Sequence, residues 1–144
     1  MTNNCNSYVL LLLLLYARGQ ITTCAEGYDC TTGVAQACTF GYYSLDGDTA
    51  CHPCPAGYQC LSGGAPAVCS DGTYSEYGAS SCTACPLGYT CVGGIKTACN
   101  TGYYTLIIGS VSCSLCPQNN MCPDKKSAVP CNTGGGEWAP SGST

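Results

Sequence analysis

Three Cys-x-x-Cys pairs are the residues of this chain whose type and spacing could support chemistry. They are Cys51 with Cys54, Cys82 with Cys85, and Cys113 with Cys116. Two such thiols can bind zinc where four ligands form an isolated cluster, and they can exchange electrons in a thioredoxin-like strand–helix setting. Here the pairs recur in a regular series without that setting. We therefore expect neither a metal nor any other cofactor.

Ionisable side chains are too sparse to suggest an enzyme. Charged residues make up 8% of the chain and the net charge is −4, whereas a folded domain carries about 25% charged residues. His52 is the single histidine, and we expect it on the surface, beside Pro53. The chain shows no Ser–His–acid set and no paired carboxylates for acid–base work. The positive residues are Arg18, Lys96, Lys125 and Lys126, which is too few for nucleic-acid binding.

The cysteines indicate a disulfide scaffold built from repeats. There are 16 cysteines in 144 residues, a proportion typical of disulfide-rich secreted proteins. A unit of four cysteines begins every 31 residues, at Cys51, Cys82 and Cys113. A fixed period of this length predicts an array of small modules rather than one globular core.

Each unit contains a short loop of the form C-P-x-G-Y-x-C. Proline fixes one backbone angle and glycine accepts a positive φ, so this pattern predicts a tight turn. The fourth copy has Asn119 at the glycine position, and asparagine tolerates the same left-handed conformation. The copies span residues 54–60 and 85–91, with variants at 24–30 and 116–122.

A longer loop of the form C-x-x-G-x-Y follows each short one. It spans residues 38–51, 69–82 and 99–113, and a second turn lies near the middle of each copy. This pattern predicts two short strands around a turn, closed by a bridge. We expect the tyrosines to lie on the bridges and cover them. The alternative is an exposed tyrosine stripe that binds sugar or a partner.

Together these motifs resemble the ephrin-receptor-like cysteine-rich repeat, a relative of the tumour-necrosis-factor-receptor modules. The resemblance rests on the Cys-Pro-x-Gly-Tyr loop, the Gly-x-Tyr loop and the Cys-x-x-Cys-Pro junction, and it covers about residues 24–131. It implies a small disulfide-rich fold, an elongated tandem array of short β-hairpin and loop modules, in an extracellular protein. It does not imply a particular ligand.

Two disulfide connectivities remain open. In the first, implied by the receptor-like long loop, each loop closes on itself and Cys5 and Cys131 are left over. In the second, cysteines cross in quartets, for example Cys51–Cys60 with Cys54–Cys69, and Cys5 replaces the cysteine missing at Ile21. The first set of pairs is Cys24–Cys30, Cys38–Cys51, Cys54–Cys60, Cys69–Cys82, Cys85–Cys91, Cys99–Cys113 and Cys116–Cys122.

The chain divides into three segments. Residues 1–19 form a hydrophobic leader whose apolar run, 9–15, is too short to span a membrane and suits a secretory signal cleaved before Gln20. The alternative is a retained leader that packs between subunits. Residues 20–131 carry about four tandem repeats, and residues 132–144 form a Gly/Ser/Pro-rich tail. We expect a secreted protein that does not span the membrane.

The leading functional hypothesis is a non-enzymatic extracellular structural protein, a self-assembling subunit of a fibre, coat or appendage. The array begins and ends half a module short, so we expect a head-to-tail homopolymer with Cys5, Cys131 and Trp138 at the joints. The alternatives are a disordered tail or a fragment of a longer repeat protein. A receptor-like or adhesive ligand-binding module is the alternative function.

Sugar is a second expected partner. No Asn-x-Ser/Thr sequon is present, so we expect O-linked rather than asparagine-linked glycans. These would help to disperse a surface that carries little charge. The alternative is that the hydroxyl groups belong to plain loops. The candidate sites are Thr22, Thr23, Thr31, Thr32, Ser141 and Ser143.

Overall fold

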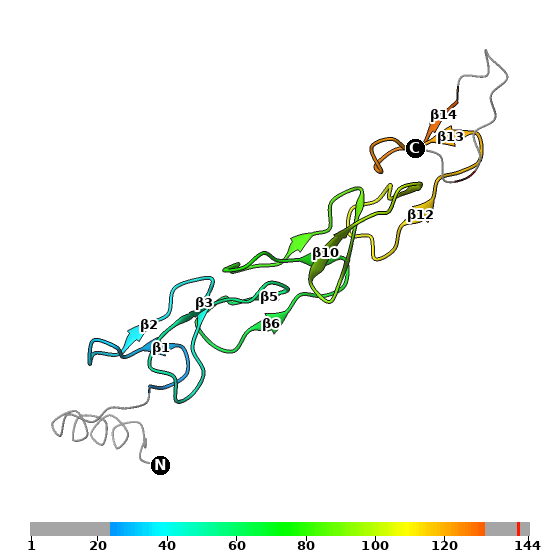
Figure 1. Cartoon of the computed structure of the whole chain (residues 1–144). Coiled ribbons are helices and arrows are strands. Elements are labelled where there is room, and N and C mark those ends of the chain that lie inside the picture. The colour runs from blue at the N-terminus through cyan, green and yellow to red at the C-terminus, as the bar shows by residue number, and fades with distance from the viewer. Residues whose placement is uncertain (1–23, 132–140, 142–144) are drawn as a thin grey trace.

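The computed structural model describes residues 24–131 and Ser141, and in them the chain forms an elongated rod (Figure 1). Seven two-stranded antiparallel sheets follow one another along it in chain order. The described residues hold no helix, and hence none long and apolar enough to span a bilayer. The predicted small disulfide-rich array of hairpin and loop modules is confirmed.

Each sheet is a hairpin of two consecutive strands. All strands have two residues except those of the fifth hairpin, which have four. The hairpins are β1 (Tyr28–Asp29) with β2 (Gln36–Ala37), β3 (Tyr42–Tyr43) with β4 (His52–Pro53), β5 (Tyr58–Gln59) with β6 (Ala67–Val68), β7 (Thr73–Tyr74) with β8 (Thr83–Ala84), β9 (Tyr89–Val92) with β10 (Ile95–Ala98), β11 (Tyr103–Tyr104) with β12 (Ser114–Leu115), and β13 (Asn120–Met121) with β14 (Val129–Pro130).

The three longer loops fold as predicted, into two short strands around a turn. In the first of them Tyr42 pairs with Pro53 and Tyr43 pairs with His52. The second strand therefore lies in the spacer of the Cys-x-x-Cys pair. Proline is tolerated there because a two-stranded sheet consists only of edge strands, where a missing N–H need not break a ladder.

The four shorter cysteine loops also begin a hairpin, which the sequence analysis did not predict. In the second copy, β5 lies inside the loop closed by Cys54 and Cys60, whereas its partner β6 lies outside the loop, just before Cys69.

The predicted left-handed turns are confirmed. Gly57 has a φ of 87°, and Asn119 occupies the matching position of the fourth copy with a φ of 63°. The short polar side chain of asparagine makes this conformation less costly than it is for most residues with a Cβ. The fourth copy therefore keeps the turn of the others without a glycine.

Cystine sulfur, rather than aliphatic side chains, fills the interior of the rod. Cys54, Cys85 and Cys116 are completely buried. By contrast, the large apolar side chains are mostly exposed. Covalent bridges must therefore supply much of the stability that an aliphatic core gives to an ordinary domain.

The tyrosines of the longer loops divide between a covered and an exposed position. Tyr104 is buried against Cys116 and Cys122, which form one bridge. Tyr42 and Tyr103, one residue earlier in the motif, are 43% and 40% exposed. Successive residues of a strand point to opposite faces, so one tyrosine of the pair turns inward and the other faces solvent.

Candidate functional site

Seven disulfides run along the rod in a single ladder. They are Cys24–Cys30, Cys38–Cys51, Cys54–Cys60, Cys69–Cys82, Cys85–Cys91, Cys99–Cys113 and Cys116–Cys122. These pairs coincide with the connectivity in which each loop closes on itself. Each bridge encloses one strand or one turn, so the ladder fixes every hairpin locally.

Main-chain hydrogen bonds join each hairpin to its neighbours. The N–H of Gly41 donates to the carbonyl of Cys60 (3.0 Å), and the N–H of Gly72 donates to the carbonyl of Cys91 (2.9 Å). The carbonyl of Gly41 in turn accepts from the N–H of Cys54 at 2.8 Å. In the first two long loops the same glycine thus ties its own hairpin to the next one along the rod, and in the third the N–H of Thr105 donates to the carbonyl of Lys125 (3.0 Å).

At two contacts between hairpins a pair of glycines approaches so closely that one of the two positions has no room for a side chain. A Cβ added at Gly94 would overlap the carbonyl oxygen and Cα of Gly57. Gly41 meets Gly78 in the same way, with equivalent overlap of a Cβ on the Gly78 carbonyl. We call these contacts the glycine seam, and they place the hairpins in direct backbone contact.

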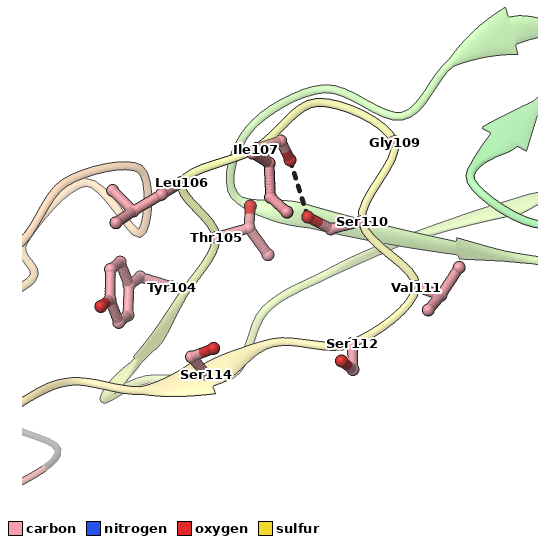
Figure 2. Close-up of a pocket in the computed structure, with 9 residues that line it drawn as sticks. All are labelled: Tyr104, Thr105, Leu106, Ile107, Gly109, Ser110, Val111, Ser112 and Ser114. Atoms are coloured by element: carbon pink, nitrogen blue, oxygen red, sulfur yellow. Dashed lines mark hydrogen bonds between the residues drawn. The ribbon is translucent and has the colours of Figure 1, made fainter.

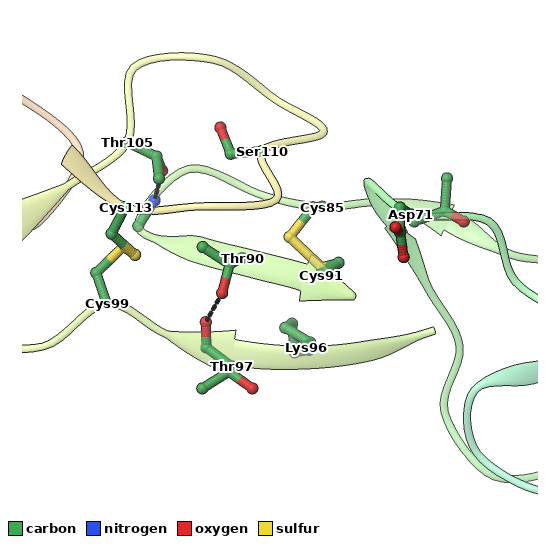
Figure 3. Close-up of a disulfide and its surroundings, with 12 residues drawn as sticks. Asp71, Cys85, Thr90, Cys91, Lys96, Thr97, Cys99, Thr105, Ser110 and Cys113 are labelled. Atoms are coloured by element: carbon green, nitrogen blue, oxygen red, sulfur yellow. Dashed lines mark hydrogen bonds between the residues drawn. A yellow bond between two sulfur atoms is a disulfide. The ribbon is translucent and has the colours of Figure 1, made fainter. Parts of the chain in front are cut away.

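Three buried hydroxyl groups complete the stacking, and the sequence analysis missed them. Ser44 and Ser75 donate from Oγ to the carbonyls of Tyr28 (2.9 Å) and Tyr58 (2.6 Å) in the preceding hairpins. Thr105 at the third position accepts from the N–H of Gly88 at 2.6 Å (Figure 3). Their signal in the sequence is a hydroxyl residue directly after the second aromatic position of every longer loop.

Lys96 contacts both a carboxylate and an aromatic ring. Its Nζ lies 2.9 Å from Glu76 Oε1 and 4.1 Å from the centre of the Tyr74 ring. The hydrogen bond to Glu76 raises the pKa of Lys96. Because Glu76 and Tyr74 belong to one hairpin region and Lys96 to the next, this cluster braces neighbouring modules.

The side chains of Asp29, Asp124 and His52 make local contacts at or near the surface. A hydrogen bond from the Thr31 hydroxyl lowers the pKa of Asp29, and the backbone N–H of Lys126 does the same for Asp124. His52 Nε2 lies 3.5 Å from Asp48 Oδ2 at the surface. Within residues 24–131, no three His, Cys, Asp or Glu side chains gather where they could hold a metal ion.

The predicted terminal and glycan residues divide between described and undescribed parts of the chain. Cys131 takes part in none of the seven bridges and is partly exposed. Thr31, Thr32 and Ser141 are exposed. The other candidates lie outside the described residues: Cys5, Thr22, Thr23, Trp138 and Ser143.

The third long loop carries an apolar tip. Leu106, Ile107 and Ile108 are 60%, 72% and 67% exposed. An open hollow of about 400 Å³ lies beside them, with Leu106 near one end and Val111 near the other (Figure 2). We call these four residues and the hollow the apolar loop.

Comparisons with known proteins add no family to this description. No protein-family model matches the chain, and no curated protein sequence matches it. The geometry of the rod and the chemistry of its surface therefore carry the functional argument.

Proposed function

We propose that the chain is a non-enzymatic extracellular structural protein, a rod-shaped subunit that joins further copies head to tail in a fibre, coat or appendage. The observation that carries this proposal is the glycine seam. It joins neighbouring hairpins through main-chain groups, and similar glycine pairs occur at Gly63 with Gly27 and at Gly72 with Gly109, whereas Gly88 meets Lys125 and Lys126. A stacking surface that repeats along a rod suits addition of another copy, and such heterologous contacts build filaments.

The cystine ladder supports the extracellular part of the proposal. Seven bridges in so short a chain persist only where thiols are oxidised, as in secreted proteins and at cell surfaces. A chain of this kind would lose its interior in a reducing compartment. The proposed location is thus the one in which the rod is stable.

Cys131 is the described residue best placed to seal a joint covalently. It follows β14 at the far end of the rod from β1, and its N–H donates to the carbonyl of Asn119 at 2.9 Å. In the proposal, the assembling chain keeps its leader, and the Cys131 thiol forms a disulfide with Cys5 of the next copy. An oxidised small-molecule disulfide outside the cell would accept the two electrons and two protons.

Electron microscopy of the secreted full chain tests the assembly. We expect filaments in native material and covalent multimers on a non-reducing gel. Cys131→Ser should abolish the covalent multimers, whereas Ser70→Ala, an exposed site far along the rod, should leave them unchanged. Short single rods at every concentration, with no intermolecular bridge, would contradict the proposal.

A receptor-like or adhesive role is the second candidate, and the outward tyrosines favour it. Tyr28, Tyr58 and Tyr103 are 38–42% exposed. They face Ala37, Val68 and Leu115 across their hairpins. Flat aromatic faces beside apolar side chains suit sugar rings or a partner protein. Binding of the monomeric rod to a glycan or cell surface, lost in Tyr58→Ser, would favour this function over assembly.

O-linked glycans are proposed on the exposed hydroxyls. The Thr31 hydroxyl already donates to Asp29 Oδ1 at 2.6 Å, and a sugar on that oxygen would remove the donated proton. Thr32, the exposed neighbour, carries no such conflict with Asp29. Intact mass before and after chemical deglycosylation, followed by peptide mapping, should place the sugar on Thr32 rather than Thr31.

A further inference from the structure

The apolar loop differs from the two equivalent loops in length and in charge. Its bridge, Cys99–Cys113, spans 14 residues, whereas Cys38–Cys51 and Cys69–Cys82 span 13. The first two loops have Leu45-Asp46-Gly47 and Glu76-Tyr77-Gly78 where the third has Leu106-Ile107-Ile108-Gly109. The third loop thus lacks the carboxylate that both others present to solvent.

The backbone holds the apolar loop in a fixed shape. Ser110 Oγ donates to the carbonyl of Ile107 at 2.7 Å and closes the turn (Figure 2). The N–H of Gly109 donates to the carbonyl of Cys85 (2.8 Å), and the carbonyl of Ser110 accepts from the N–H of Cys91 (3.0 Å). Since these bonds restrain the tip before any partner arrives, binding there would cost little ordering entropy.

The surface beside the tip has an exposed side chain next to a hollow. Ile107 and Val111 line the hollow, whereas Ile108 is 67% exposed and does not line it. A contact with two-fold symmetry requires one patch to fit a second copy of itself. A projecting Ile108 next to a hollow of about 400 Å³ meets that requirement.

Charge along the chain also favours a second copy as the partner. Residues 97–123 contain no Asp, Glu, Lys or Arg, whereas six of the eight acidic residues lie between Glu26 and Glu76. Two copies, each with a net charge of −4, repel least where their uncharged stretches meet. Lys125 lies beside the start of the loop, since the N–H of Thr105 donates to its carbonyl at 3.0 Å. With Lys126 it makes two positive charges, fewer than the cluster of about four to eight that attracts anionic lipid.

We propose that the apolar loop is a lateral contact at which two copies of the chain pack side by side, with Ile108 of each in the hollow of the other. This contact is distinct from the head-to-tail joint and goes beyond the proposed function. Four side chains cannot supply the roughly 800 Å² per partner of a standard interface. Two single rods therefore pair weakly, whereas two fibres pair tightly because the contact repeats along them.

A loop graft provides the test, because the chain itself contains a charged version of the same loop. In one variant, Leu106-Ile107-Ile108 is replaced by the Leu-Asp of residues 45–46, which also restores the 13-residue spacing. The matched control carries Leu61→Ser and Val68→Ser, two apolar residues that are 56% and 57% exposed on another hairpin. Sedimentation velocity of the secreted full chain is measured over a wide concentration range.

We expect wild type and control to show concentration-dependent pairing, and the graft to weaken it about tenfold or more. Amide NMR shifts that change with concentration should be confined to residues 104–114. Equal pairing in the graft, no pairing in any protein, or shifts elsewhere would overturn the proposal. Binding of the wild-type loop to phosphatidylcholine vesicles without pairing would overturn it in favour of a membrane contact.

The test separates the lateral contact from the head-to-tail joint. If filaments form, the graft should leave their length unchanged and remove only their side-by-side pairing in electron micrographs. If filaments fail to form, the proposed function falls, while pairing of single rods remains measurable. Filaments that pair equally with the graft would overturn the lateral contact alone.

Discussion

Ser75 and Tyr58 join two hairpins of the rod through one buried hydrogen bond. Ser75 Oγ lies 2.6 Å from the carbonyl oxygen of Tyr58, and the serine is almost completely buried. The two residues are 17 positions apart. Ser44 and Tyr28 repeat the contact one module earlier. A hydroxyl of this kind links modules that share few side-chain contacts, so it should matter to stability.

Removal of this hydroxyl should destabilise the rod. Ser75→Ala removes this donor from the carbonyl of Tyr58 in a part-buried contact, and we expect a loss of about 1 kcal/mol. Ser70→Ala, at an exposed serine, is the control and should change the free energy of unfolding by less than about 0.5 kcal/mol. Denaturant unfolding under oxidising conditions measures both variants. Equal stabilities would show that the contact contributes nothing.

One glycine at each contact of the glycine seam should not tolerate a methyl group. Gly94→Ala adds a Cβ that overlaps the Gly57 backbone, whereas a Cβ at Gly78 has open space around it. The two glycines have almost the same φ, 80° and 77°. Both substitutions therefore carry the left-handed penalty of about 1–2 kcal/mol, and only Gly94→Ala also displaces the neighbouring hairpin. Gly94→Ala should melt at a clearly lower temperature than Gly78→Ala.

Reduction should unfold the whole rod. In the loop-entropy model, bridges that close loops of about 14 residues contribute about 3 kcal/mol each, and the shorter bridges about 2 kcal/mol each. Excess dithiothreitol at constant pH should therefore abolish resistance to proteolysis along residues 24–131. Protease resistance that survives complete reduction, verified by thiol labelling, would contradict a cystine interior.

The pKa of Asp29 should depend on its hydrogen bond to Thr31. The folded pKa of Asp29 is lowered, chiefly by the Thr31 hydroxyl. The bond thus favours the folded state above the ordinary pKa of an aspartate, and this contribution is lost as pH falls through the lowered value. Thr31→Ala should raise the pKa of Asp29 in a carboxyl NMR titration, whereas Thr32→Ala should not change it.

The pKa of Lys96 is shifted in the opposite direction to that of Asp29. Its folded pKa is raised, chiefly by Glu76, so the contribution is complete below the unfolded pKa and is lost as pH rises through the folded one. Glu76→Gln should lower the pKa of Lys96 in an NMR titration of its side chain. Because the pair is exposed, we expect little change in global stability. An unchanged Lys96 pKa would exclude this brace.

Much of the fold could be predicted from residue spacing because the repeated pattern is covalent and local. The period of the cysteines, the C-P-x-G-Y-x-C turns and the long-loop hairpins need only neighbouring residues to form. Asn119 even shows its left-handed φ where the pattern has glycine. The hairpins of the short loops escaped prediction because their second strands, such as β6 between Cys60 and Cys69, lie in stretches that neither cysteine-loop motif includes.

The sequence by itself determined the modular, cystine-filled character of the protein, since cysteine spacing and turn residues act within a few positions of one another. Only the tertiary structure decided how modules meet: Ser75 beneath Tyr58, Gly94 against Gly57, and an exposed Ile108 beside a hollow. These contacts join residues 17 or more positions apart, or depend on the curvature of a surface. No local pattern specifies them, because they arise from the way successive hairpins stack.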